Sequence, residues 1–166
     1  DDMITKYEHD TSSLEERIDA FNKLQKAKGY ILRPSIEPII AYPGFEEDYR
    51  QLAQIMTKEL ALGSANVEKI KFGCLRIGSP LRPKIESNHP NTDLFDANEM
   101  LFPAVPPDTK FRYSEDVRIR IYEILISEFS QFRPKLALAC EYPSVWKKLG
   151  MSYEDHLKDY VYQYPG

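Results

Sequence analysis

Leu136-Ala137-Leu138-Ala139-Cys140 is a run of five residues without a charged side chain. A short, wholly apolar run of this kind is typical of a strand that is buried on both faces in a parallel sheet. Pro134 ends the segment before it, and Pro143 opens a short predicted helix after it, which Gly150 closes. The run therefore predicts one strand of a parallel sheet near the end of the chain.

A helix is predicted directly before this strand, over residues 116–132. Its apolar side chains recur every four residues and so share one face, at Val117, Ile121, Leu125 and Phe129. Two further helices are predicted upstream, over 12–28 and 46–62, and a glycine follows each of them. Ser12 and Glu15 fit a capping box at the start of the first.

Strands are predicted between these helices, over 30–41 and 67–77, because both segments are rich in large apolar and β-branched residues. Residues 1–10 predict another short strand that leads into a loop. The stretch 88–114 predicts a long loop, since its prolines interrupt any regular structure: Pro90, Pro103, Pro106 and Pro107. Strands and helices that alternate in this way predict an α/β fold made of parallel βα units.

The composition bounds the class of protein. The chain has 166 residues, 42% of them hydrophobic, which is enough for one compact domain with its own core. No apolar run approaches the roughly 18 residues of a membrane span and no leader opens the chain, so the sequence predicts no membrane and a cytoplasmic location. The opening Asp1-Asp2-Met3 favours a cut within a longer protein, with a cloning remnant before Met3 as the alternative.

Metal and nucleic-acid binding are weakly supported by composition. The two cysteines, Cys74 and Cys140, and the three histidines have no paired spacing, so the sequence predicts no metal site. An iron–sulfur cluster usually needs three or four cysteines, and this chain cannot hold one unaided. The net charge of −4 is not that of a strongly basic nucleic-acid-binding protein, although local basic clusters can still bind an anion.

Five groups of segments carry a family resemblance through their order and spacing. They are Glu8-His9-Asp10-Thr11 with residues 14–20; Gly29-Tyr30 with Glu37-Pro38-Ile39-Ile40 and residues 44–49; residues 71–76; Phe111-Arg112-Tyr113; and residues 138–141 with Val145-Trp146 and Leu149-Gly150. Together they resemble the spore photoproduct lyase group of radical-S-adenosylmethionine (SAM) proteins, over about residues 5–151. The three-cysteine cluster loop of that family is absent from this chain.

The resemblance implies that residues 1–151 form the C-terminal part of a partial (β/α)6 TIM-like barrel, with 152–166 as a tail. It also implies a role as the C-terminal domain of a DNA-lesion repair lyase, which shapes the SAM and substrate pocket and is inactive alone. SAM and a [4Fe–4S] cluster would then belong to the parent protein, with no cofactor on this chain. The implied partners are the missing N-terminal barrel half and DNA, and an exposed sheet edge favours self-association. The alternative is a stand-alone nucleic-acid-binding or protein-interaction module derived from such a barrel.

The resemblance also implies which residues form the site, because barrel chemistry lies at the C-terminal ends of strands. Four residues are expected to contact the substrate or DNA: Lys110, Arg112, Tyr113 and Arg76. A solvated arginine and a packing tyrosine are the alternative for Arg112 and Tyr113. Lys110 and Arg112 also belong to a basic cluster with Arg118 and Arg120, for which a charged face balanced by acidic residues is the alternative. Glu8 and Glu37 are expected to meet SAM's amino group or hydroxyls, with helix capping or an ion pair as the alternative for both. For Arg76, structural pairing with a carboxylate is the alternative.

Overall fold

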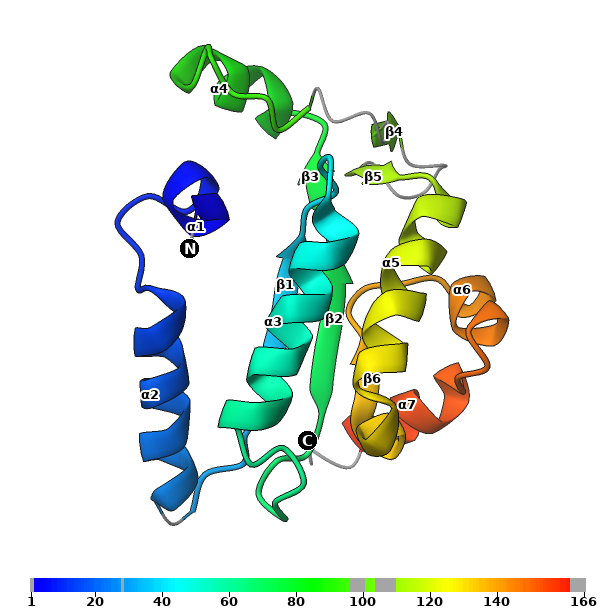
Figure 1. Cartoon of the computed structure of the whole chain (residues 1–166). Coiled ribbons are helices and arrows are strands. Elements are labelled where there is room, and N and C mark those ends of the chain that lie inside the picture. The colour runs from blue at the N-terminus through cyan, green and yellow to red at the C-terminus, as the bar shows by residue number, and fades with distance from the viewer. Residues whose placement is uncertain (1, 28, 96–100, 104–109, 162–166) are drawn as a thin grey trace.

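A computed structural model describes residues 2–27, 29–95, 101–103 and 110–161 (Figure 1). Its elements are, in chain order, α1 (Asp2–Tyr7), α2 (Leu14–Lys26), β1 (Ser35–Ile39), α3 (Phe45–Glu59), β2 (Ile70–Cys74), β3 (Arg76–Gly78), α4 (Leu81–Asn88), β4 (Leu101–Pro103), β5 (Lys110–Tyr113), α5 (Glu115–Glu128), the 3-10 helix η1 (Ser130–Lys135), β6 (Leu136–Leu138), α6 (Pro143–Lys148) and α7 (Tyr153–Val161). No helix among these residues is long and apolar enough to cross a bilayer.

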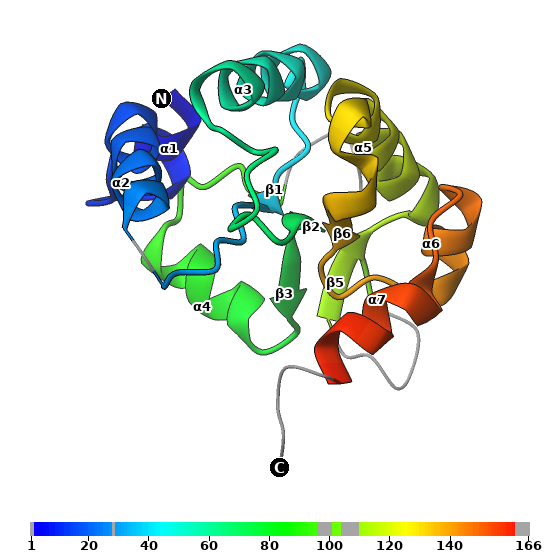
Figure 2. The same ribbon diagram turned by 90° about the horizontal axis from the view of Figure 1, so that it is seen from below.

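A three-stranded parallel sheet lies at the centre of the fold, in the order β1-β2-β6. The predicted strand at 136–140 is β6, and its Leu138 lies opposite Phe72 of β2. Helices α3 and α5 pack side by side along one face of this sheet (Figure 2). The predicted α/β class with parallel βα units is therefore confirmed, while the (β/α)6 barrel remains a prediction.

A second, antiparallel sheet corrects two of the sequence predictions. Its order is β3-β5-β4, and it takes β3 from the predicted single strand 67–77 and two strands from the predicted loop 88–114. The single strand divides at Leu75, whose N–H donates to Ile39 O of β1, and the chain then leaves the parallel sheet. Pairing between segments this far apart in sequence has no local signature, which is why periodicity did not reveal it.

The N-terminal segment is also corrected. Residues 2–7 form helix α1 instead of a strand, and contacts with a distant loop hold it: Tyr7 Oη donates to Asp93 Oδ1 at 2.8 Å, and Lys6 forms an ion pair with the same carboxylate. The N-cap of α2 is Ser13, one residue later than predicted. Its side chain accepts from Glu16 N, and Glu16 completes the capping box.

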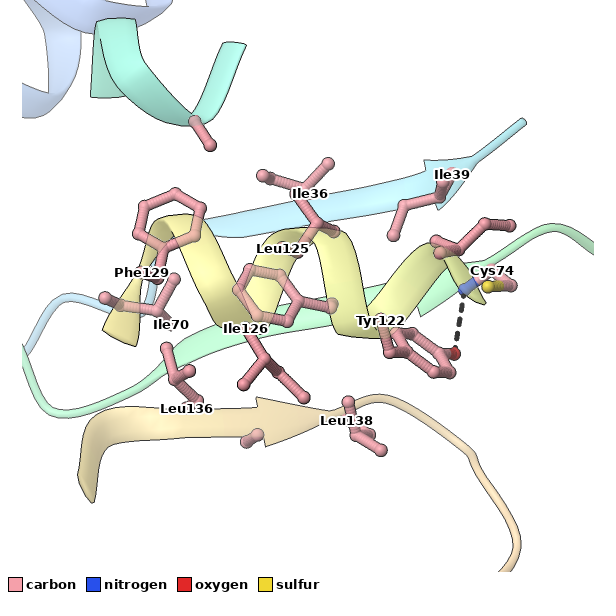
Figure 3. Packing of buried hydrophobic residues seen from close by; sticks show 14 of the residues in the cluster. Ile36, Ile39, Ile70, Cys74, Tyr122, Leu125, Ile126, Phe129, Leu136 and Leu138 are labelled. Carbon is pink, nitrogen blue, oxygen red and sulfur yellow. Dashed lines mark hydrogen bonds between the residues drawn. The ribbon is translucent and has the colours of Figure 1, made fainter. Parts of the chain in front are cut away.

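The core lies between the parallel sheet and helices α3 and α5. Phe72 of β2 and Phe129 at the end of α5 are fully buried, with ring centroids 5.5 Å apart. Ile121 and Leu125, which belong to the predicted helical stripe, are buried on the same face of α5 (Figure 3 shows Leu125 and Phe129). Full burial of each such side chain contributes roughly 1.5–3 kcal/mol, so this face of α5 fixes the helix to the sheet.

The two edge strands of the parallel sheet differ in cover. All three residues of β6 are buried, whereas three of the five residues of β1 are exposed. Helix α2 stands beside β1 and has no fully buried residue (Figures 1 and 2). Between α2, β1 and α3 runs a groove of about 510 Å³, whose apolar lining includes Leu14, Ile18 and Phe21 of α2.

Candidate functional site

The candidate site lies where the parallel strands end. Strands β1, β2 and β6 all point the same way, and the antiparallel pair β3–β5 begins directly beyond their C-terminal ends. The residues after β6, Cys140 and Glu141, reach the same region, because Arg112 of β5 contacts both of them. In parallel α/β sheets, ligands commonly bind at this edge.

A buried ion pair forms one side of the site. The Glu141 side chain is 1% exposed and accepts from Arg118 of α5 at two atoms, at 2.9 Å from Nε and 3.2 Å from Nη2. Tyr122 Oη and Tyr142 N also donate to this carboxylate, at 3.2 and 2.9 Å. Tyr122 Oη in turn accepts from Cys74 N at the end of β2 (Figure 3). The charge of Glu141 is thus fully hydrogen-bonded, as a buried carboxylate requires.

Arg112 is held firmly next to this pair. Its Nη1 donates to Cys140 O at 2.9 Å, and Nη1 lies 4.0 Å from Glu141 Oε1. The Tyr142 ring covers the guanidinium, with its centroid 4.7 Å from Cζ, in a cation–π contact. Arg112 is buried, and these contacts hold its guanidinium group in one orientation.

Tyr113 points instead toward β1. Its ring is 1% exposed, and its hydroxyl accepts from Ala41 N at 2.9 Å. Burial raises the pKa of Tyr113 well above its ordinary value, so this phenol stays neutral. Tyr49 of α3 accepts in the same way from the preceding amide, Ile40 N. Contact between Tyr113 and a substrate remains a prediction.

Arg76 and Glu37 form the other side of the site. Arg76 of β3 lies directly opposite Arg112 of β5, so the two guanidinium groups leave the same face of the antiparallel pair. Arg76 Nη2 lies 3.7 Å from Glu37 Oε1, and both side chains are partly exposed, at 19% and 31%. The expected alternative, structural pairing of Arg76 with a carboxylate, is thus present in the structure.

The net positive charge of the cluster around Arg76 and Arg112 favours an anionic ligand. Two carboxylates, Glu37 and Glu141, face three guanidinium groups, Arg76, Arg112 and Arg118. Like charges directly opposite one another in a sheet are destabilising, and the pairing of Arg76 with Arg112 is such a case. One anionic group between these two arginines would neutralise the set, and a guanidinium group suits a phosphate or a carboxylate.

The remaining predicted site residues lie apart from this charge cluster. Lys110 begins β5 and is exposed. Glu8 forms an exposed ion pair with Arg17 of α2, at 2.6 Å. Both Glu8 and Glu37, the two carboxylates expected to meet SAM, line the groove beside α2. Their contact with a cofactor remains a prediction.

The cysteines do not fit a [4Fe–4S] cluster. Cys74 is fully buried, which raises the pKa of its thiol to about 12 and disfavours the thiolate that an iron ligand needs. Cys140 is exposed at the other side of the site. Among the residues that the structure describes, no group of three or more histidine, cysteine or acidic side chains could hold a metal ion.

Sequence reasoning missed Arg118 and Glu141 as members of the site. The sequence placed Arg118 only in a basic cluster with Lys110, Arg112 and Arg120, with a charged face balanced by acidic residues as the alternative, yet Arg118 is 5% exposed. The available signal was Glu141 itself, an acidic residue directly after a buried strand, which requires a buried or ligand-facing cation as its partner.

Comparisons of the sequence and of the structure with known proteins both match this chain to spore photoproduct lyases. The family model described as spore photoproduct lyase matches residues 1–138. The chain is 36% identical, over 96 residues or 57% of its length, to the spore photoproduct lyase of Bacillus subtilis (strain 168), and covers 27% of that protein.

Solved structures of spore photoproduct lyase share the fold. One, complexed with dinucleoside spore photoproduct, has a TM-score of 0.64 and 25% sequence identity, over 81% of this chain and 40% of that chain. A variant with bound AdoMet and dinucleoside spore photoproduct has a TM-score of 0.59 and 24% identity, over 78% of this chain and 38% of that one. The chain therefore spans well under half the length of these relatives.

Proposed function

Because this chain belongs to the spore photoproduct lyase family, we propose that it forms the C-terminal part of a cytoplasmic radical-SAM lyase that repairs a thymine lesion in DNA. In this proposal it shapes the SAM and substrate pocket and grips the substrate, and it is inactive alone. The observation that carries the proposal is the pair of opposed arginines, Arg76 and Arg112, at the C-terminal ends of the parallel strands.

The arginine pair suits the backbone of a dinucleotide. Two adjacent thymidines are joined by one phosphodiester, which carries one negative charge, and the charge cluster has one positive charge in excess. A guanidinium group can donate two parallel hydrogen bonds to phosphate oxygens. A solved relative is described as complexed with dinucleoside spore photoproduct, which supports a ligand of two nucleosides, while the phosphodiester contact rests on the arginine pair alone.

The cofactors belong to another segment in this proposal. The described residues do not fit a [4Fe–4S] cluster, so the cluster and most contacts to SAM are assigned to an N-terminal barrel half. Glu8 and Glu37 would contribute a carboxylate wall to the SAM pocket from this chain. The radical chemistry would therefore start outside the residues described here.

The groove beside α2 also supports an N-terminal barrel half that packs against this chain. In a right-handed crossover, a strand that precedes α2 and runs parallel to β1 lies on the open side of β1, beneath α2. The groove is there, and the half-buried Ile18 and Phe21 line it. We assign the length of the groove along β1 to a strand of the N-terminal barrel half, which would pair with the edge of β1 and leave Glu8 and Glu37 facing the SAM pocket.

Substrate binding by the full chain tests the proposal. Titration with thymidylyl-thymidine and with its spore-photoproduct form, followed by calorimetry, should show weak, salt-sensitive binding. Arg76→Gln should weaken it about tenfold, the worth of roughly 1.4 kcal/mol for one charge-assisted contact. Arg17→Gln is the matched control, because Arg17 also pairs with a carboxylate but lies on α2. Equal affinities for the wild type and Arg76→Gln would contradict the proposal.

Size-exclusion chromatography tests the role of the open edge. A chain that lacks its barrel partner should self-associate through β1, and addition of the N-terminal half should convert it to a heterodimer. A stable monomer that ignores the N-terminal half would favour the alternative, a stand-alone nucleic-acid-binding or interaction module.

A further inference from the structure

We infer that Glu37 is a specificity-determining residue, an internal competitor that occupies Arg76 until an anionic ligand displaces it. The inference rests on the proposed function, because it concerns one half of the same arginine pair. It assigns different roles to the two arginines. Arg112 keeps the same contacts with and without the ligand, whereas Arg76 exchanges Glu37 for the ligand.

The contacts of the two arginines differ in kind. Arg112 Nη1 makes a 2.9 Å hydrogen bond to Cys140 O and is covered by the Tyr142 ring. Arg76 Nη2 lies 3.7 Å from Glu37 Oε1, which is within ion-pair range but beyond hydrogen-bond distance. The contact between Arg76 and Glu37 is therefore electrostatic and easily exchanged, because neither group is locked in one geometry.

A glycine creates the position that Glu37 occupies. The Glu37 side chain starts on β1, crosses over Gly73 of the neighbouring strand β2 and reaches Arg76 on β3. A Cβ atom on Gly73 would come within 2.6 Å of Glu37 Cδ and 2.7 Å of Oε1. Real Cβ atoms essentially never approach so closely, so any larger residue at position 73 would displace the carboxylate.

The partial exposure of Glu37 allows its carboxylate to move away from Arg76. Its side chain is 31% exposed and lines the groove beside α2, so it can turn toward solvent when it leaves Arg76. A phosphodiester that binds the arginine pair must replace this carboxylate, and part of its binding free energy is lost to that exchange. A neutral ligand makes no such exchange, so Glu37 lowers the affinity for anions selectively.

Removal of the Glu37 charge tests the inference in the full chain. With thymidylyl-thymidine as the probe, Glu37→Gln should bind about two- to fivefold more tightly than the wild type, the range expected for a partly exposed ion pair. The methylphosphonate analogue of the same dinucleotide is uncharged and should show no gain. In the Arg76→Gln background, the Glu37→Gln substitution should also give no gain.

Two further variants separate competition from general charge effects. Asp48→Asn removes another carboxylate of the same groove and should leave affinity unchanged, because the Asp48 carboxylate accepts from Tyr42 Oη at 2.8 Å. Gly73→Ala should reproduce the tighter binding of Glu37→Gln, since it displaces the carboxylate and retains its charge.

The outcomes distinguish this inference from the proposed function. If wild-type binding depends on Arg76 but Glu37→Gln gives no gain, or gives a gain that persists without Arg76, the inference is wrong and the proposed function stands. If neither the wild type nor Glu37→Gln binds the dinucleotide, the proposed function fails and the inference fails with it.

Discussion

The two flanks of the parallel sheet are built on different principles. On the β6 flank, the Arg118–Glu141 pair is buried and every oxygen of the carboxylate has a donor. On the β1 flank, the strand is largely exposed and the Glu37–Arg76 contact is loose. The difference teaches that one chain can hold a preorganised anchor and an adaptable arm on opposite sides of a single site.

Burial explains why the flanks differ. A buried charge must be fully paired, because an unpaired one costs several kcal/mol, so the β6 flank tolerates only one arrangement of its ion pair. A partly exposed pair contributes only about 0–1 kcal/mol, because water competes for both partners. The β1 flank is therefore free to exchange contacts without loss of the fold.

The largest expected effect comes from removal of a carboxylate on each flank. Glu141→Ala should lower the free energy of unfolding by roughly 3–5 kcal/mol, because it leaves the Arg118 charge buried without its partner. Glu37→Ala on the other flank should change it by less than about 1 kcal/mol. Urea unfolding followed by circular dichroism measures both. Similar losses for the two variants would erase the proposed contrast.

A smaller effect is expected from the two tyrosines that cap β1. Tyr113→Phe removes the acceptor of Ala41 N in a buried setting and should cost about 2 kcal/mol. Tyr49→Phe removes the acceptor of Ile40 N, where the bond is only partly buried, and should cost about 1 kcal/mol. Thermal unfolding of both variants ranks them, and an equal or reversed ranking would contradict the larger contribution expected of the buried Tyr113 bond.

The smallest effect concerns the central strand that both flanks share. Burial raises the pKa of the Cys74 thiol from 9.0 to about 12, so the folded protein keeps a proton that the unfolded chain releases. This contribution is complete below pH 9 and is lost as pH rises toward 12, by at most about 1.4 kcal/mol per pH unit. We expect the free energy of unfolding to fall between pH 9 and 10, ahead of the tyrosines.

Two cysteine variants check that assignment. Cys74→Ala should flatten the fall between pH 9 and 10, whereas Cys140→Ser, which retains the buried thiol of Cys74, should leave it in place. Denaturant titrations at three or four pH values are sufficient. A slope that survives Cys74→Ala would move the responsible group elsewhere in the core.

The sequence predicted the parallel part of the fold and missed the antiparallel part for a physical reason. The stripe from Val117 to Phe129 and the apolar run at 136–140 are local patterns, so helix α5 and strand β6 could be predicted directly. Strand β5 pairs with β3, more than thirty residues away, and only tertiary structure makes that pairing favourable.

Only some of the residues of the candidate site were predicted from the sequence. Arg76 and Arg112 were expected, and the structure brings them opposite one another. Arg118 and Glu141 were not, because their partnership spans 23 residues and neither residue type signals burial in isolation. A charged residue that follows a wholly apolar strand is the feature that deserves a partner search in similar sequences.

The two tyrosines at the end of β1 also limit how far another strand can pair with β1. Because the amides of Ile40 and Ala41 already donate to the hydroxyls of Tyr49 and Tyr113, neither N–H can join a ladder with an added strand. A strand that enters the groove beside α2 would therefore find donors only within residues 35–39, where Pro38 has none. In the proposed assembly, these two phenol groups would therefore limit how much of β1 an added strand can pair with.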